Sequence, residues 1–425
     1  MDDAAFGRLL TRLLADAHRC GPDDLPSLLR GAARSMGLLD ATIFVADIQQ
    51  NLLAPLPDGP GPSASDEARP SLAVDGTLAG WAYRTESLRI TSGDDLTIWL
   101  PLVDGIERIG VIRLMAPHLD ASTLDQCKTL ASLTGQLVHS KAEYSDTILH
   151  TARTRPMTMQ AELAWAFMPP RTIGNDRVTS SAVLEPAYEI GGDAFDHSLT
   201  ADTLHVSVVD AMGHDLASGL SAAVAMAGCR STRRAGGSLT DITTAVDDAL
   251  NRWLPERLLT AVFADLDLHT GVLTWVNRGH PPPLIIRRQR VVPGALKRAS
   301  QLPLGLAPEV SSPASTIHQV QLQPGDRVLI HTDGVTEARS STGEQFGEQR
   351  LIDTIVRATS AGEPASEALR RLIHTILDHH RDHLTDDATI LLAEWHPHVS
   401  APGPRSSLVD SGQNTELGRD GGTAA

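Results

Sequence analysis

Acidic residues recur at four places in the second half of the chain, each beside glycines, small residues or turn formers. The four segments are Gly191–Asp193, Asp210–His214, Thr332–Gly334 and Asp386–Thr389. One hydrophobic run that reads as a strand leads into Asp210, a second leads into Asp333, and a third follows Asp386. Carboxylates gathered at strand ends from distant segments form sites for hard cations such as Mg²⁺ and Mn²⁺, which prefer oxygen to sulfur. The sequence therefore favours a fold that brings these strand ends together.

Further motifs accompany the acidic segments in a fixed order. They are Asn277–Pro283, Leu302–Leu306 and Gln345–Gly347. At these residues the chain resembles the SpoIIE-like branch of the PPM metal-dependent Ser/Thr protein phosphatases, over roughly Ile173 to Trp395. A single Asp-Gly pair means little, but all of these elements in one order and at domain-scale spacing are specific.

The resemblance implies roles for individual residues around two Mn²⁺ or Mg²⁺ ions. Asp210 is expected to bridge both ions, and the backbone carbonyl of Ala211 to complete one of them. Asp333 and Asp386 would hold the other ion, and Asp193 would bind on the first ion's side, directly or through water. Such a metal pair binds phosphate oxygens and generates hydroxide near neutral pH. Asp193, Asp210, Asp333 and Asp386 are therefore the expected catalytic residues.

Other interpretations remain open at neighbouring positions. Any one of the four carboxylates alone reads as an ordinary turn residue, whereas the ordered set argues against that reading. Asp196 and Asp387 are expected to support the ligands or the local structure rather than to bind metal. His214 and His280 are interpreted as structural loop and turn residues rather than as proton donors.

Two positions depart from the family's pattern. Asp215 stands where the family usually has glycine, and it adds a charge near the expected metals. The stretch Ala182–Ile190 contains no Arg or Lys, so the phosphate-binding arginine of the broader PPM group is absent. Phosphate binding would then rest on the metals.

Composition limits the partners and the compartment. A chain of 425 residues is long enough for two or three domains. The formal net charge of −16 argues against general binding to nucleic acid or to anionic membranes. The three cysteines, Cys20, Cys127 and Cys229, lack metal-ligand spacing and are expected to be reduced thiols. Because no apolar run approaches a membrane span and the start lacks a basic signal peptide, we expect a cytoplasmic protein.

The first part of the chain is expected to be a sensor. Residues 1–120 resemble a GAF domain, chiefly through the helical segment Leu78–Thr85 followed by two strands, Thr97–Val103 and Arg108–Met115. The alternative is another sheet-and-helix dimerisation domain. Residues 121–170 are expected to be a helical linker, interrupted at Pro156, which either forms a homodimer through a coiled coil or simply packs.

The second part mixes strands and helices. Residues 171–396 are expected to form a phosphatase domain with the α/β/β/α layers of the PPM fold, and residues 397–425 a disordered tail. The predicted class of the whole chain is thus α+β, with a GAF-like α/β sensor domain, a helical linker and a C-terminal sandwich.

The resemblance implies a function for the whole chain. Relatives dephosphorylate phosphoserine or phosphothreonine on an anti-sigma-factor antagonist with a STAS domain, in a bacterial partner-switching pathway, and the sensor would regulate this activity. One alternative is a catalytically degenerate phosphatase domain that serves as a partner-binding module. Another is a two-metal hydrolase that acts on small phosphate esters.

Overall fold

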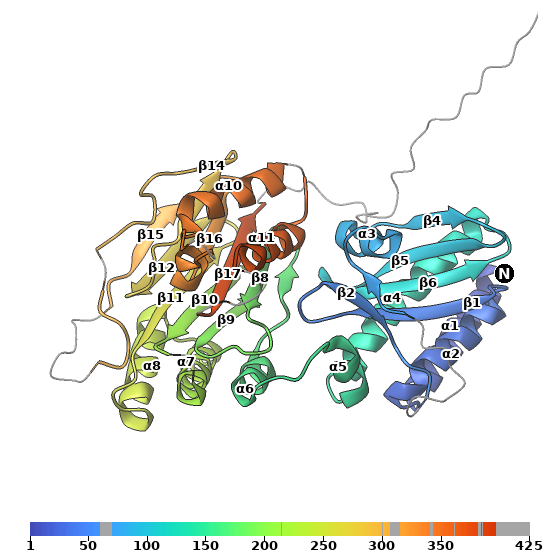
Figure 1. Cartoon of the computed structure of the whole chain (residues 1–425), viewed down its shortest axis with the longest axis horizontal. Helices are drawn as coiled ribbons and strands as arrows, with labels where there is room; N and C mark the ends of the chain where they lie inside the picture. The colour runs from blue at the N-terminus through green and yellow to red at the C-terminus, as the bar shows by residue number, and fades with distance from the viewer. Residues whose placement is uncertain are drawn as a thin grey trace, which may run out of the picture.

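The strands of this computed structural model form three antiparallel sheets, one in the N-terminal part and two in the C-terminal part (Figure 1). The structure describes residues 1–59, 70–213, 215–299, 301–306, 315–340, 343–360, 362–380, 384 and 386–396. The tail predicted at 397–425 and the predicted loop residue His214 lie outside the described residues.

The N-terminal part is a six-stranded sheet in the order β3-β2-β1-β6-β5-β4. Its strands are β1 (Asp40–Ala46), β2 (Leu52–Pro55), β3 (Leu72–Ala73), β4 (Arg89–Ser92), β5 (Leu96–Asp104) and β6 (Glu107–Ala116). The expected hairpin is β5 and β6, whose turn places Gly105 at a φ of 59°, a conformation that favours glycine. The helices are α1 (Asp3–Ala17), α2 (Leu25–Ser35), α3 (Leu78–Thr85), α4 (Ala121–Ala142) and α5 (Asp146–Ala152).

Alternation along the strands gives this sheet two buried faces. On one face, Ile43, Leu100 and Ile112 pack against α1, α2, α4 and α5. On the other face, Phe44 and Val111 pack against α3. The sheet is therefore covered by helices on both sides.

Most of the segment predicted as a linker belongs to this N-terminal core. Cys127, Leu130 and Val138 of α4 and Ile148 of α5 are buried in the same cluster as the sheet. Helix α6 (Met159–Phe167) instead buries Ala161 in the main C-terminal core. The passage between the two cores is thus short, at residues 153–158, because the apolar stripe of α4 packs on the sheet.

The C-terminal part has the α/β/β/α order expected from the sequence. One sheet runs β15-β12-β11-β10-β9 and the other β14-β13-β16-β17-β8-β7. The first comprises β9 (Asp193–Leu199), β10 (Thr203–Ala211), β11 (Leu259–Asp267), β12 (Val272–Arg278) and β15 (His318–Gln321). The second comprises β7 (Thr172–Gly174), β8 (Val178–Glu185), β13 (Leu284–Arg287), β14 (Arg290–Val291), β16 (Arg327–His331) and β17 (Ala388–Trp395).

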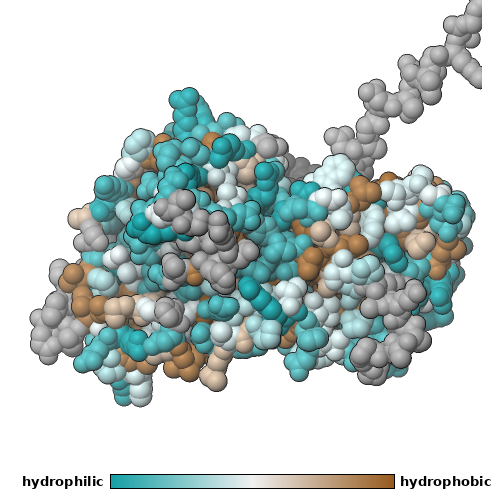
Figure 2. Space-filling model, viewed as in Figure 1, coloured by the Kyte–Doolittle hydropathy of each residue, from teal (hydrophilic) through white to brown (hydrophobic). Residues whose placement is uncertain are grey.

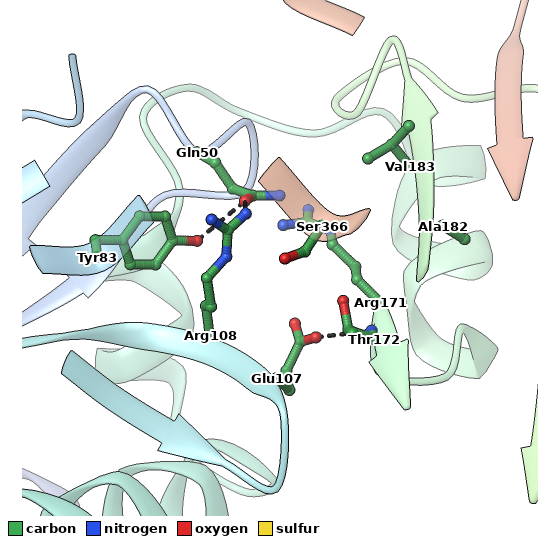
Figure 3. A pocket seen from close by; sticks show the side chains of 9 residues that line it. All are labelled: Gln50, Tyr83, Glu107, Arg108, Arg171, Thr172, Ala182, Val183 and Ser366. Carbon is green, nitrogen blue, oxygen red and sulfur yellow. Dashed lines mark hydrogen bonds between the residues drawn. The ribbon is translucent and has the colours of Figure 1, made fainter. Parts of the chain in front are cut away.

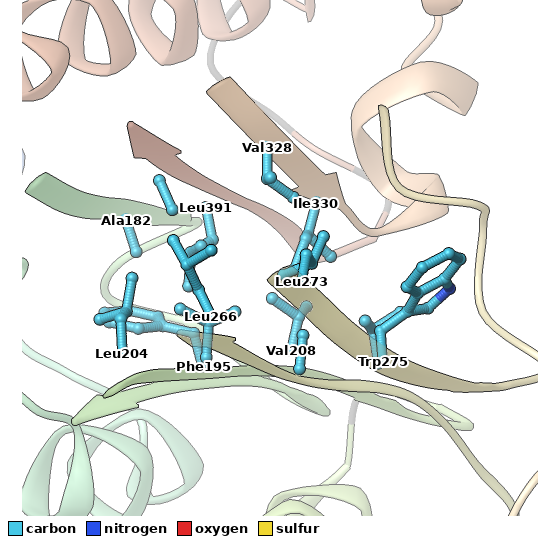
Figure 4. Packing of buried hydrophobic residues seen from close by; sticks show 14 of the residues in the cluster. Ala182, Phe195, Leu204, Val208, Leu266, Leu273, Trp275, Val328, Ile330 and Leu391 are labelled. Atoms are coloured by element: carbon cyan, nitrogen blue, oxygen red, sulfur yellow. The ribbon is translucent and has the colours of Figure 1, made fainter. Parts of the chain in front are cut away.

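The two sheets pack face to face through apolar side chains. Phe195 and Val208 from the first sheet meet Ile330 and Leu391 from the second, with Trp275 at one side (Figure 4). Each of these side chains is almost completely buried. Burial of this apolar area is the main force that holds the sheets together.

Helices cover the outer faces of both sheets. Helices α7 (Leu216–Arg234) and α8 (Leu239–Trp253) pack on the first sheet, where Met226 and Val246 are buried. Helices α10 (Gly347–Ser360) and α11 (Ala365–His380) pack on the second, and the short α9 (Asp333–Glu337) follows β16. Helix α10 and strand β9 were not predicted from the sequence.

The exposed surface in the view of Figure 2 is mainly hydrophilic, with scattered hydrophobic residues. Among the described residues, every helix is too short or too polar to cross a bilayer.

His205 of β10 gives the fold a measurable pH dependence. Burial opposes its charged form, but hydrogen bonds to Asp265 at 2.8 Å and Cys229 at 3.4 Å outweigh burial and raise the pKa of His205 to about 9. A raised folded-state pKa stabilises the fold below the unfolded value of about 6.5, and this gain is lost as pH rises through 9.

We therefore expect the wild type to exceed His205→Gln in unfolding free energy at pH 6, by about 1–3 kcal/mol. The difference should shrink by pH 9.5, when His205 is neutral in both states. Urea unfolding of both proteins at the two pH values measures it. A difference that is constant or grows with pH would show that His205 is not protonated in the folded chain.

Candidate metal centre

Asp193 and Asp210 lie opposite each other on adjacent strands. Asp193 begins β9, and Asp210 is the penultimate residue of β10; the two are paired in the antiparallel register. Because side chains alternate along a strand, both point to the same side as Phe195 and Val208, the inner face between the sheets. Two carboxylates from neighbouring strands thus lie at one end of the inter-sheet core.

The second sheet supplies partners for Asp193. The hydroxyls of Thr332 and Thr389 donate to its Oδ2 at 2.8 and 2.7 Å. Thr332 follows β16 and Thr389 lies in β17, so these bonds join the two sheets at the acidic end. Burial, together with the charges of Asp210 and Asp387, raises the pKa of Asp193 well above its ordinary value.

Asp387 organises the loop ahead of Asp193. Its Oδ2 accepts hydrogen bonds from the backbone amides of Gly191, Gly192 and Asp193, at 2.8, 2.6 and 3.2 Å. Burial raises the pKa of Asp387, and these three amides act in the opposite direction. The structure thus gives Asp387 the supporting role expected for it.

Two glycines permit close approach of the backbone at this centre. A Cβ on Gly192 would lie 2.3 Å from the carbonyl oxygen of Ala211. A Cβ on Gly334 would lie 1.9 Å from the carbonyl oxygen of Asp387. Any side chain at either position would push the loops of the acidic segments apart.

Asp333 and Asp386 complete the acidic group from exposed positions. Asp333 begins α9, one residue after β16 ends, and Asp386 precedes β17. Burial of Asp210, followed by the charges of Asp333, Asp386 and Asp387, raises the pKa of Asp210 to about 7. The fold therefore brings the four predicted carboxylates into one electrostatic neighbourhood.

The side chains do not converge further. In the part of the chain that the structure describes, no three His, Cys, Asp or Glu side chains are arranged to hold a metal ion. The donor set itself fits a hard divalent cation, because it consists of oxygen atoms and its like charges favour a cation between them.

The other predicted positions lie around this centre. Asp196 faces away from it and pairs with Arg230 and Arg233 at 2.7 and 2.9 Å, which is a structural role. Asp215, which stands where the family usually has glycine, is the N-cap of α7. Its side chain accepts a hydrogen bond from the backbone amide of Ser218. These two acids therefore have ordinary structural explanations.

His280 connects to the centre through Thr260. Thr260 is paired with Asp210 across β10 and β11, and its hydroxyl lies 2.9 Å from Nδ1 of His280. Burial, followed by the charge of His331, lowers the pKa of His280 to about 3. A neutral, buried imidazole matches the structural role that the sequence analysis gave it.

Three threonines were missed by sequence reasoning. Thr260, Thr332 and Thr389 orient the carboxylates through their hydroxyls. Thr332 and Thr389 stand inside the acidic segments themselves, so their position was a usable signal. The position of Thr260 in the sequence gave no such signal, because Thr260 comes close to Asp210 only through strand pairing.

Comparison with known proteins supports a phosphatase-type domain in this part of the chain. Residues 200–396 match the family model described as stage II sporulation protein E (SpoIIE). Protein IcfG of Synechocystis sp. is 35% identical over 102 residues, which make up 24% of this chain and 15% of that protein. The chain therefore spans only a small part of that relative. The resemblance to the SpoIIE-like family is confirmed for residues 200–396.

Two solved structures are similar to about half of this chain. The RsbU and RsbW domains of Rv1364c from Mycobacterium tuberculosis are 23% identical, over 53% of this chain and 62% of that one, with a TM-score of 0.44. The SiaA-PP2C domain of Pseudomonas aeruginosa is 22% identical, over 51% of this chain and 85% of that one, also with a TM-score of 0.44.

Proposed function

We propose that the chain is a Mn²⁺- or Mg²⁺-dependent phosphatase that hydrolyses phosphoserine or phosphothreonine on a protein. The observation that carries this proposal is the gathering of Asp193, Asp210, Asp333 and Asp386 at one end of the inter-sheet core. The SpoIIE match over 200–396 supports the same reaction class. The proposed ligands are those four carboxylates and the carbonyl of Ala211.

The chain's own residues would position the reacting groups. Bound metal would supply Lewis acidity and a hydroxide nucleophile. Thr332 and Thr389 fix the rotamer of Asp193, and Asp387 fixes the backbone that carries it. Because these partners are buried, the side chain of Asp193 would be held ready for a cation rather than reorganised by it.

The protein substrate follows from the family resemblance. A STAS-domain anti-sigma-factor antagonist in a bacterial partner-switching pathway, and a cytoplasmic location, remain proposals on that basis. A phosphatase domain that has lost activity and only binds its partner is the alternative. The retained acidic set argues for the active form, since a pure binding module has no need of crowded carboxylates that cost stability.

Regulation by the N-terminal part is supported by its direct contact with the phosphatase part. The six-stranded sheet with helices on both faces suits the proposed GAF-like sensor. Figure 3 shows side chains from both parts converging at their boundary, among them Tyr83, Arg108 and Thr172. Glu107 accepts from the amide of Thr172 at 2.7 Å, and Gln49 donates to Glu185 at 2.8 Å.

Buried charges extend this boundary onto α11. Arg108 of β6 donates to Glu367 at 3.0 Å, and the side chains are 3% and 4% exposed. Arg370, 1% exposed, binds both Glu367 and Asp75 at 2.9 Å. Helix α11 ends at His380, six residues before Asp386. We propose this network as a route, besides the helical linker, by which the sensor influences the acidic centre.

A comparison of substrates tests the proposed activity. The full chain should dephosphorylate a phosphoserine STAS protein with Mn²⁺ or Mg²⁺ and stop when EDTA is in excess. A partner-binding module would bind that protein without turnover, and a small-ester hydrolase would favour p-nitrophenyl phosphate. Turnover that persists in EDTA would contradict the metal assignment.

A further inference from the structure

A basic cleft lies between helix α6, strand β9 and the C-terminal end of helix α7. It has a volume of about 350 Å³ and is bounded by Phe167, Met168 and Pro169 on one side. Arg230, Arg233 and Arg234 of α7 line it together with Asp196, His197 and Ser198. A volume of this size matches the lower range of small-molecule sites.

The cleft carries a surplus of positive charge. Its three guanidinium groups face one carboxylate, that of Asp196, whose side chain is 2% exposed. Burial lowers the pKa of His197 to about 4, so this imidazole is neutral near pH 7 and adds no charge. An excess of two positive charges in one cleft stands out on a chain whose net charge is −16.

Asp196 fixes the arginines without using all of their donors. Its Oδ1 accepts from Nε and Nη2 of Arg230, and its Oδ2 accepts from Nη1 of Arg233. Among the described residues, Nη1 of Arg230, Nε and Nη2 of Arg233 and the whole guanidinium of Arg234 have no acceptor. Two guanidinium groups are therefore held in place with donors to spare, as in sites that bind anions.

We propose that this cleft binds a small phosphomonoester-type anion. The oxygens of a phosphate dianion can accept hydrogen bonds from several guanidinium donors at once. A phosphate ligand therefore suits a group of three arginines better than a ligand with a single carboxylate. Phe167, Met168 and Pro169 border the cleft, so an organic group attached to the phosphate would lie beside them. Both free phosphate and an organic phosphate share the chemistry that the arginines recognise.

The cleft is separate from the candidate metal centre. Asp196 lies three residues beyond Asp193 on β9, about 10 Å along the strand, and its side chain points to the helix-covered face. Arg230 lies 14 residues after Leu216, about 20 Å along α7. One border of the cleft is the C-terminal end of α6, the first helix of the C-terminal part, so a bound anion would touch this helix.

Binding of inorganic phosphate and of adenosine monophosphate to the full chain tests the proposal. Calorimetry is done in EDTA on the Asp210→Asn protein, so that the metal centre does not contribute. Arg234→Gln is the main variant, because the side chain of Arg234 makes no hydrogen bond or ion pair among the described residues and its loss should leave the fold intact. Arg233→Lys, which keeps a charge beside Asp196, is the second variant, and the exposed Arg290→Gln is the matched control.

We expect Arg234→Gln to weaken binding about tenfold, Arg233→Lys to weaken it less, and Arg290→Gln to leave it unchanged. Tighter binding of adenosine monophosphate than of phosphate would identify an organic phosphate as the natural class. Equal binding of the two would identify free phosphate. Two results would overturn the proposal. One is that neither ligand binds at about 10 mM, which is ten times a typical metabolite concentration. The other is that Arg234→Gln and Arg290→Gln bind equally well.

Discussion

Replacing Asp210 with Asn is expected to reduce metal-dependent phosphatase turnover by about a thousandfold or more. The substitution keeps the shape of the side chain but removes the charge proposed to bridge two cations. Loss of a single electrostatic donor in an enzyme site already costs about 10²–10³ in kcat. Steady-state kinetics on a phosphoprotein, with Mn²⁺ varied, measures the loss.

The same substitution should stabilise the metal-free protein. Asp210 is crowded by Asp333, Asp386 and Asp387, and this crowding contributes to the raised pKa of Asp210. Removing one charge relieves the repulsion, so Asp210→Asn should unfold at a higher urea concentration than wild type at pH 8 in EDTA. Function and stability are then opposed at this residue, as at many active sites.

Two further variants distinguish the loss of a proposed metal ligand from the loss of another carboxylate. Asp353→Asn removes an exposed carboxylate on α10 and should change neither turnover nor stability appreciably. Asp387→Asn keeps an oxygen that accepts from the amides of Gly191 and Gly192, so it should retain more activity than Asp210→Asn. If Asp210→Asn turned over substrate as fast as Asp353→Asn, the bridging assignment would be wrong.

The local parts of the candidate site were predictable because each acidic segment adjoins a hydrophobic run. Val208 and Val209 ahead of Asp210, and the run ahead of Asp333, have strand composition, and the structure places strands there. Strand β9 was missed because its sequence, DAFDHSL, contains polar residues at buried positions. Asp196 and His197 are buried there only because Arg230 and the carbonyl of Pro170 satisfy them.

Long-range pairing explains what else the sequence did not reveal. Arg108 and Glu367 are 259 positions apart, and neither has a local pattern that indicates the other. Helix α10 is a different case, because Leu351, Ile355 and Ala358 recur at helical spacing and were a usable signal. The sequence left two possibilities for α4, because an apolar helical stripe does not specify whether it packs on a sheet or on a second copy; in the structure the stripe packs on the sheet.

Replacing Arg370 with Ala is expected to destabilise the contact between the two parts of the chain. Arg370 is 1% exposed and donates to both Glu367 and Asp75. Its removal leaves Glu367, 4% exposed, with fewer partners in a buried position. Breaking a buried ion pair in this way typically costs about 3–5 kcal/mol. Hydrogen exchange should then rise in α11 and in β6, on both sides of the boundary.

A double-mutant cycle shows whether the charges couple across the boundary. Arg108→Gln, Glu367→Gln and the double variant give the interaction energy between β6 and α11. The matched control is the pair Arg327 and Glu394, at 2.9 Å, which lies within one sheet. Metal affinity is measured in the same proteins, because α11 leads toward Asp386.

The proposed route requires a particular pattern in these variants. Weakening the pair of Arg108 and Glu367 should lower metal affinity as well as stability, since the loop after α11 would be held less firmly. The control pair should lower stability alone. An Arg370→Ala protein with wild-type unfolding free energy would show that the network contributes nothing to the boundary. Unchanged metal affinity in a destabilised Glu367→Gln protein would leave the helical linker as the path for regulation.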